Sequence, residues 1–270
     1  MDQAAKARAF KALHERPKLF VIPNPWDGAS AKLLASQGFE ALTTTSAGLA
    51  FVLGKPDGGV TREQSLWNAK LIVDNVNIPV AADLEKGFGD APEDAAETIR
   101  QAAKVGLVGG SIEDATGDPA KPIYDFALAV ERVAAAAEAA RKLDFPFMFV
   151  ARAENFLHGR ADLDETIKRL QAFEKAGADV LFAPGLPNIE TIRTVVQSVT
   201  KPVNVVRGGP GPTLAELEAA GVRRVSLGGS LARAAYTALK KAGEELLGSG
   251  TFNFGEGILT TAALNKLMTD

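Results

Sequence analysis

The sequence contains no cysteine and only two histidines in 270 residues. Without cysteine the chain has no disulfides, no zinc-thiolate site and no thiol nucleophile. Two histidines are too few for a metal centre built from several imidazoles. Any metal site must therefore use oxygen ligands, which suit hard cations such as Mg²⁺.

The chain also lacks a surplus of positive charge and any apolar run of membrane-spanning length. Its formal net charge of -3 argues against a basic surface of the kind that binds nucleic acid. The first residues, MDQAAKARAFKALHERP, predict a short polar helix and contain no signal-peptide core. We therefore expect a cytoplasmic protein with neither a nucleic-acid partner nor a membrane partner.

Eight short runs rich in apolar or β-branched residues recur along the chain, and a segment with helical spacing follows each of them. The runs are Leu19–Pro23, Ala41–Ser46, Pro79–Asp83, Val108–Asp114, Phe147–Arg152, Val180–Pro184, Pro202–Val206 and Arg224–Gly228. Alternation of this kind predicts parallel strands joined by crossover helices, and eight such units predict a closed (β/α)8 barrel of the TIM type. With no linker-like segment, residues 1–270 are interpreted as one barrel domain.

The last 21 residues lie outside the eightfold count. Residues 250–270 predict a glycine-rich bend followed by a short amphipathic helix. Two interpretations remain open for this extra C-terminal helix: a lid over the bottom of the barrel, or an oligomerisation segment that contacts a second subunit.

Polar side chains follow the predicted strands where each strand ends. They are Asn24, Asp27, Thr45, Ser46, Asp83, Glu85, Glu113, Asp114, Arg152, Glu154, Asn204 and Arg207. Because the carboxyl ends of barrel strands converge around one axis, we expect these residues to form the active site. No predicted strand ends in lysine, which argues against a Schiff-base mechanism.

The carboxylates at the ends of the third and fourth strands suit a magnesium site, with Asp83, Glu85 and Glu113 as candidate ligands. Mg²⁺ could hold a 2-oxo acid and stabilise an enolate, while Arg152 grips a carboxylate or phosphonate. A simpler interpretation stays open for several of these residues. Strand-end acids are often helix N-caps, above all Asp27 and Asp114, and Arg152 could form a structural ion pair with Glu154 or Glu113.

The motifs NPWDGASAKLLASQGFEALTTTSAGLAFVLGKPDG, ADLEKGFGD, GGSIEDATGD and VARAENF occur in this order. Through them the sequence resembles the isocitrate lyase/phosphoenolpyruvate mutase superfamily over nearly its whole length. The resemblance implies a barrel whose last helix is swapped between subunits, commonly in a dimer of dimers, so that the protein is a homo-oligomer, either a dimer or a homotetramer.

The resemblance also implies roles for individual residues. Asp83 would bind Mg²⁺ directly, with Mn²⁺ as a substitute, while Asp57, Glu85 and Glu113 hold the ion through water. It places Thr45, Ser46, Ala47 and Arg152 on the substrate, with Thr45 to Ala47 as a loop of backbone donors. The candidate catalytic residues are Arg152, Glu113 and Asp57, and Asn204, at the end of the seventh predicted strand, is a further candidate for substrate binding.

Two departures from the superfamily pattern limit which of its activities we expect. The gating loop of isocitrate and methylisocitrate lyases, which carries a catalytic cysteine, is replaced here by EDATGDPAKPIYDFALAV, although Lys121 could approach the mouth. Glu85 stands where the family usually has aspartate. We therefore hypothesise a Mg²⁺-dependent lyase that cleaves a C–C bond beta to a small 2-oxo or 2-hydroxy acid through an enolpyruvate-like intermediate. The alternatives are a phosphonomutase acting on phosphonopyruvate or a carboxyphosphonoenolpyruvate-type substrate, and a catalytically silent metabolite-binding barrel.

Overall fold

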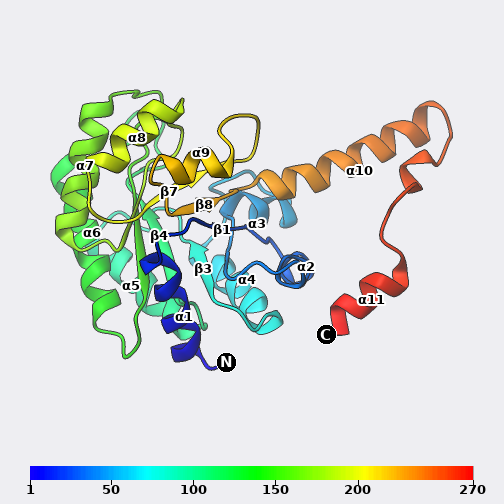
Figure 1. The fold of residues 1–270 in the computed structure, drawn as a ribbon, viewed down its shortest axis with the longest axis horizontal. Coiled ribbons are helices and arrows are strands. Elements are labelled where there is room, and N and C mark those ends of the chain that lie inside the picture. The colour runs from blue at the N-terminus through cyan, green and yellow to red at the C-terminus, as the bar shows by residue number, and fades with distance from the viewer. Residues whose placement is uncertain (270) are drawn as a thin grey trace.

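The computed structural model describes residues 1–269, in which eight parallel strands form a nearly closed barrel surrounded by helices (Figure 1). The strands are β1 (Phe20–Ile22), β2 (Leu42–Thr43), β3 (Val80–Asp83), β4 (Gly109–Glu113), β5 (Met148–Arg152), β6 (Val180–Phe182), β7 (Val203–Val206) and β8 (Arg224–Ser226). Each lies within a run predicted from the sequence, so the TIM-type fold is confirmed. Strand β8 pairs with β1, and the sheet has β1 and β2 at its two ends. The backbone amide of Thr43 in β2 donates to the carbonyl of Pro23, just after β1, at 3.1 Å, so these two ends lie side by side.

Helices follow the strands in the alternation that the sequence predicts. They are α1 (Gln3–Glu15), α2 (Gly28–Ser36), α3 (Ser46–Val52), α4 (Arg62–Asn75), α5 (Pro92–Lys104), α6 (Phe126–Arg141), α7 (Leu163–Ala176), α8 (Ile189–Gln197), α9 (Leu214–Ala219), α10 (Ser230–Gly248) and α11 (Thr261–Thr269), with a 3-10 turn at Asn253–Gly255. None of the helices in this described part of the chain has the length and apolar character needed to span a bilayer.

The helix ends follow from local chemistry. Asp27 accepts a hydrogen bond from the backbone amide of Ser30, whose hydroxyl accepts from the amide of Asp27, and this capping box starts α2. Asp27 is therefore a helix N-cap, which was the simpler of the two interpretations of this strand-end acid. Helix α7 ends at Gly177, whose φ of 111° lies in the left-handed region that only glycine adopts without strain.

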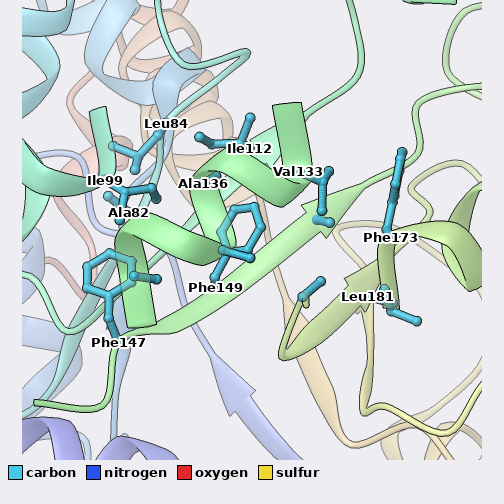
Figure 2. Packing of buried hydrophobic residues seen from close by; sticks show 14 of the residues in the cluster. Ala82, Leu84, Ile99, Ile112, Val133, Ala136, Phe147, Phe149, Phe173 and Leu181 are labelled. Carbon is cyan, nitrogen blue, oxygen red and sulfur yellow. The ribbon is translucent and has the colours of Figure 1, made fainter. Parts of the chain in front are cut away.

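The main hydrophobic core lies between the strands and the helices outside them. Phe149 of β5 is fully buried, and Figure 2 shows it next to Val133 and Ala136 of α6. Because side chains alternate along a strand, Phe147, Phe149 and Ala151 face the helices while Met148, Val150 and Arg152 face the barrel axis. Complete burial of a phenylalanine contributes about 2 to 3 kcal/mol.

Helix α1 closes the bottom of the barrel and is not merely a polar leader. Phe10 is fully buried in an interior cluster with Phe20, Ile22 and Val150. A Cβ atom on Gly109 would come within 2.8 Å of the Phe10 ring, so this strand position admits only glycine. Of the two interpretations left open for the C-terminal segment, the lid over the barrel bottom is wrong, because α1 occupies that place.

His14 belongs to the segment that the sequence predicts as a short polar helix, but it is not exposed to solvent. Its side chain is buried against Phe10 and Phe20, with ring centroids 4.7 Å and 5.0 Å away. Its Nδ1 donates to the carbonyl of Phe10 at 2.8 Å. Burial and the positive charge of Arg224 lower the pKa of His14 to about 3.

The C-terminal helices leave the barrel. Helix α10 projects away from it, and α11 returns to lie beside α2, where the amine of Lys32 donates to the carbonyl of Met268 at 2.7 Å (Figure 1). Ala232 is the one residue of α10 that is buried. The helix after β8 therefore does not cover its own barrel as the preceding helices do.

Because His14 is buried, we expect the free energy of unfolding to depend on pH. The folded pKa of His14 lies below its unfolded value, so its contribution is present above pH ~6.5 and is lost as pH falls toward 3. Between about pH 7.5 and about pH 5 this amounts to about 2 kcal/mol. We expect His14→Gln to flatten this part of the curve of unfolding free energy against pH, measured by urea denaturation. The exposed His158, changed in the same way, is the matched control, and equal curves for the two variants would contradict the assignment.

Candidate active site

A cavity of about 200 Å³ opens at the carboxyl ends of the strands and reaches down into the barrel. It is lined by Asn24, Thr43, Thr44, Thr45, Ser46, Ala47, Asp57, Asp83, Ser111, Arg152, Leu157, Phe182, Pro184, Asn204, Val206, Arg224, Ser226, Gly228 and Gly229. The structure thus brings together Thr45, Ser46, Ala47, Asp57, Asp83, Arg152 and Asn204, as predicted from the sequence. Glu85 and Glu113 lie near the cavity but do not line it.

Arg152 at the end of β5 forms ion pairs with carboxylates on three successive strand ends. Its Nη1 lies 3.0 Å from Asp83 and its Nη2 lies 3.2 Å from Glu113. Its Nε lies 2.8 Å from the buried Glu154. Burial lowers the pKa of Arg152, but the three negative charges outweigh it, and the net pKa is raised. The structural ion pair that the sequence left open is present with both glutamates and with Asp83.

Asp83 is held from both sides. Its Oδ1 accepts from Arg152 and from the backbone amide of Glu85 at 3.2 Å. Its Oδ2 accepts from the hydroxyl of Ser46 at 2.8 Å and from the Ser46 amide at 3.3 Å. These contacts fix one carboxylate at the rim of the cavity in a single orientation.

The other acidic groups are short of compensating positive charge. Burial and the charge of Asp83 raise the pKa of Asp57 above its ordinary value. The same two causes, with Asp57 added, raise the pKa of Glu85 to about 7, and its Oε1 is buried without a hydrogen-bond partner. Burial likewise raises the pKa of Glu113, even though Arg152 opposes the shift. A divalent cation placed among these groups would relieve their mutual repulsion.

The geometry limits how such a cation could be held. Across residues 1–269, no three acidic or histidine side chains are spaced to ligate one ion directly. This fits Mg²⁺, which usually keeps several waters and uses one or two carboxylates. Glu85 is aimed by a turn in which its own φ is 48°, a left-handed conformation that is strained for glutamate.

The turn after β3 is fixed by Arg132 of α6. Its Nη1 donates to the carbonyls of Gly89 and Ala91 at 2.9 Å and 3.2 Å. Its guanidinium also stacks over the ring of Tyr124 at 4.5 Å. A fully buried arginine thus holds the glycine-rich loop that follows the paired acids, which explains why strain at Glu85 persists.

Two predictions about local structure are corrected here. Thr45 to Ala47 do not form a loop, because Thr45 caps α3 through a hydrogen bond from the Gly48 amide, and Ser46 is the first residue of that helix. Asp114 is not a helix cap. It is buried, accepts from the Glu154 amide at 2.8 Å and pairs with Arg169 at 3.1 Å.

The segment between β4 and α6 is folded back on itself and contributes no side chain to the cavity lining. Thr116 is hydrogen-bonded to Pro122 and Lys121, and Tyr124 donates to Asp90 at 2.5 Å. Lys121 pairs with Asp125 at 2.7 Å and does not reach the mouth, contrary to the prediction. No acid from this segment therefore faces the site.

Several residues that line the cavity were not predicted from the sequence, chiefly Thr43, Ser111, Ser226 and Arg224. They lie inside strands rather than at strand ends, so a search of strand ends passes over them. The sequence does indicate such residues, because each is a polar residue at one of the alternating strand positions that face the barrel axis. The clearest case is Arg224, a charged residue that begins a buried strand. Asn24 was found but is structural, since its amide bonds both Thr44 and the Leu227–Gly228 backbone.

Comparison with known proteins gives consistent matches. A family model described as phosphoenolpyruvate phosphomutase matches residues 10–247. The sequence is 31% identical to 2,3-dimethylmalate lyase of Eubacterium barkeri, over 82% of this chain and 78% of that protein. It is 30% identical to 2-methylisocitrate lyase of Escherichia coli K12, with the same coverage of 82% and 78%.

Among solved structures, a candidate lyase/mutase from Burkholderia cenocepacia J2315 superposes with a TM-score of 0.97. Its sequence is 53% identical, and the match covers 99% of this chain and 97% of that one. The resemblance to the isocitrate lyase/phosphoenolpyruvate mutase superfamily, inferred from sequence motifs, is thus confirmed.

The ion pairs of Arg152 predict a large effect on stability. We expect Arg152→Met to lower the free energy of unfolding by about 3 to 5 kcal/mol, because it leaves three acidic groups without their partner. Arg16→Met, which removes a more exposed pair with Glu40, should cost less than about 1 kcal/mol. Urea denaturation of both variants measures the difference, and similar losses would show that Arg152 does not hold the strand ends.

Proposed function

The chain belongs to the phosphoenolpyruvate phosphomutase family, within the isocitrate lyase/phosphoenolpyruvate mutase superfamily, and on this premise we propose that it is a Mg²⁺-dependent C–C lyase. Its substrate would be a small 2-oxo or 2-hydroxy acid, cleaved through an enolpyruvate-like intermediate. The observation that carries the proposal is Asp83, oriented by Ser46 and Arg152 at the rim of the cavity and surrounded by acids with raised pKa values.

The residues fit Mg²⁺ by their chemistry. Asp83 would be the direct ligand, and Asp57, Glu85 and Glu113 would hold the ion through water, with Mn²⁺ as a substitute. The bound ion would polarise the 2-oxo group and stabilise negative charge that develops beside it. The pKa values of Asp57 and Glu85 are raised above those of ordinary carboxyls. A bound cation would lower these pKa values and so keep both groups ionised.

The chain's own residues would orient the substrate. The backbone amides at the start of α3, from Ser46 and Ala47, border the cavity beside Asp83 and would bind the 2-oxo acid end. The guanidinium carbon of Arg152 lies 5.1 Å from the centre of the Phe182 ring, and both residues line the cavity. Its charge is already shared among three carboxylates, so it would act on the reacting centre without being the main anchor of a free carboxylate.

A phosphonomutase is the alternative within the family. C–C cleavage is favoured because 2,3-dimethylmalate lyase and 2-methylisocitrate lyase, which are 31% and 30% identical to this chain, are both lyases by name. Phosphorus NMR of phosphonopyruvate incubated with the enzyme would separate the two activities. The cytoplasmic location remains a prediction from the sequence.

We propose further that α10 and residues 250–270 contact a second copy of the chain in a dimer or a dimer of dimers. Leu239, Leu247, Phe252 and Ile258 expose 68%, 93%, 73% and 64% of their surface in the isolated chain. Large apolar side chains of this number along one projecting segment are typical of a protein interface. A swap of α10 between barrels would also cover the side of each barrel that its own α10 leaves open.

The function predicts Mg²⁺-dependent release of pyruvate or glyoxylate from one of four candidates: oxaloacetate, a methylated malate, 2-methylisocitrate or phosphonopyruvate. We expect Asp83→Ala to reduce the rate about 100-fold or more, because the ion loses its direct ligand. Asp27→Ala is the control, since it removes a helix cap outside the cavity, costs about 1 kcal/mol of stability and leaves turnover intact. Tight Mg²⁺-dependent binding of oxalate without turnover of any candidate would instead indicate a metabolite-binding barrel or a different substrate.

The interface predicts that Leu239→Glu shifts the protein to a smaller species, because a charge replaces an apolar contact. Light scattering coupled to size-exclusion chromatography measures the mass. Lys240→Gln on the same turn serves as the control. If the wild type already elutes as a monomer, the proposed interface is wrong.

A further inference from the structure

The cavity contains two guanidinium groups, and only one of them is neutralised by protein carboxylates. Arg152 carries three ion pairs. Arg224 is 4% exposed and makes no ion pair with any residue in 1–269. Its Nε and Nη1 are buried and have no hydrogen-bond acceptor.

Arg224 lies at the inner end of the cavity, toward the barrel floor. It is the first residue of β8 and pairs in register with Phe20 of β1 and Asn204 of β7. Two polar side chains accompany it along the cavity wall. The Nδ2 of Asn204 donates to the hydroxyl of Ser226 at 3.0 Å, while Oδ1 of Asn204 is buried without a donor.

The surroundings of Arg224 supply no balancing charge. His14 lies on the floor side, and burial together with the charge of Arg224 lowers its pKa, so it is neutral at pH 7 and offers no negative charge. Burial lowers the pKa of Arg224 to about 9, so the group remains protonated at neutral pH. A buried cation without a partner opposes folding, and an apolar side chain of similar length would serve the core better.

We propose that Arg224, assisted by the hydroxyl of Ser226, binds a second carboxylate of the substrate at the floor of the cavity. The substrate is then a diacid, with its 2-oxo acid end at Asp83 and Ser46 and its other carboxylate at Arg224. A carboxylate suits this site because two coplanar oxygens match the fork of a guanidinium. The assignment of the first end rests on the proposed function, whereas the assignment of Arg224 rests on its burial and its lack of a partner.

A carboxylate site at Arg224 makes the enzyme specific for substrates that carry a second negative charge away from the reacting centre. A monoacid that fills the Asp83 end would leave Arg224 buried and unpaired, and so would bind weakly. The carboxylate bound at Arg224 must also keep its charge during the reaction, because a cation that stabilises a charge consumed in the reaction slows it. The floor therefore favours substrates whose second carboxylate survives cleavage.

Two inhibitors of equal charge test the proposal by isothermal titration calorimetry on the full-length protein with Mg²⁺. Oxalate fills the 2-oxo acid end alone, and 3,3-difluorooxaloacetate adds a carboxylate two carbons further on. We expect Arg224→Gln to weaken difluorooxaloacetate about 10-fold or more and oxalate less than about 3-fold, with Arg224→Lys between wild type and Gln. Equal changes for the two ligands, or none for either, would overturn the second-carboxylate site.

A second measurement keeps the inference separate from the proposed function. In the ligand-free protein, Arg224→Met should raise the melting temperature by about 2 to 4 °C, because it removes an unpaired buried charge. Arg223→Met, the neighbouring position on the outer side of the strand, is the matched control and should change little. A lower melting temperature for Arg224→Met than for the control would assign Arg224 a structural role instead. If the wild-type protein binds neither inhibitor, the proposed function is wrong. The melting temperatures would still decide whether Arg224 is an unpaired buried charge or a structural residue.

Discussion

The guanidinium of Arg152 is the interaction on which the mouth of the barrel depends. Strands β3, β4 and β5 end in Asp83, Glu113 and, two residues past the strand, Glu154, three carboxylates that would repel one another if left alone. A single planar cation at the end of β5 satisfies all three through different nitrogens. The same contacts that keep the strand ends together also orient Asp83 toward the cavity, so the stability of the rim and the geometry of the site have one cause.

Much of the fold could be predicted from the sequence because βα repetition leaves a regular trace. Each apolar run ended up in the sheet, and glycines such as Gly177 marked the helix ends. The environment of single residues was harder to predict. Asp114 was misjudged because it is buried through a pair with Arg169, 55 residues away, that no local pattern identifies. His14 was misjudged because its burial comes from the packing of α1 against the strand that carries Phe20.

The candidate site was predictable to the extent that it lies at strand ends. Asp83 and Arg152 follow directly from that rule, while Glu85 and Glu113 sit beside the cavity without lining it. The polar residues deeper in the barrel escaped notice because a barrel interior is normally packed with apolar side chains. Here the interior is divided between apolar and polar side chains: Phe10, Ile22 and Val150 belong to an apolar cluster, whereas Asn204, Arg224 and Ser226 line the cavity. This division makes room for a ligand inside what would otherwise be core.

The start of α10 connects the outer reach of the molecule to the centre of the site. Gly229, just before α10, borders the cavity, and a Cβ atom there would lie 3.3 Å from that of Ala47 in α3. Helix α3 in turn begins at Ser46, which holds Asp83. A Cβ atom on Gly48 of α3 would likewise lie 3.5 Å from that of Ala232 in α10, so the first turns of the two helices pack closely and a change in the direction of α10 would also displace α3. The surface on which the projecting helix α10 packs therefore helps to set the position of the Asp83 carboxylate in the cavity.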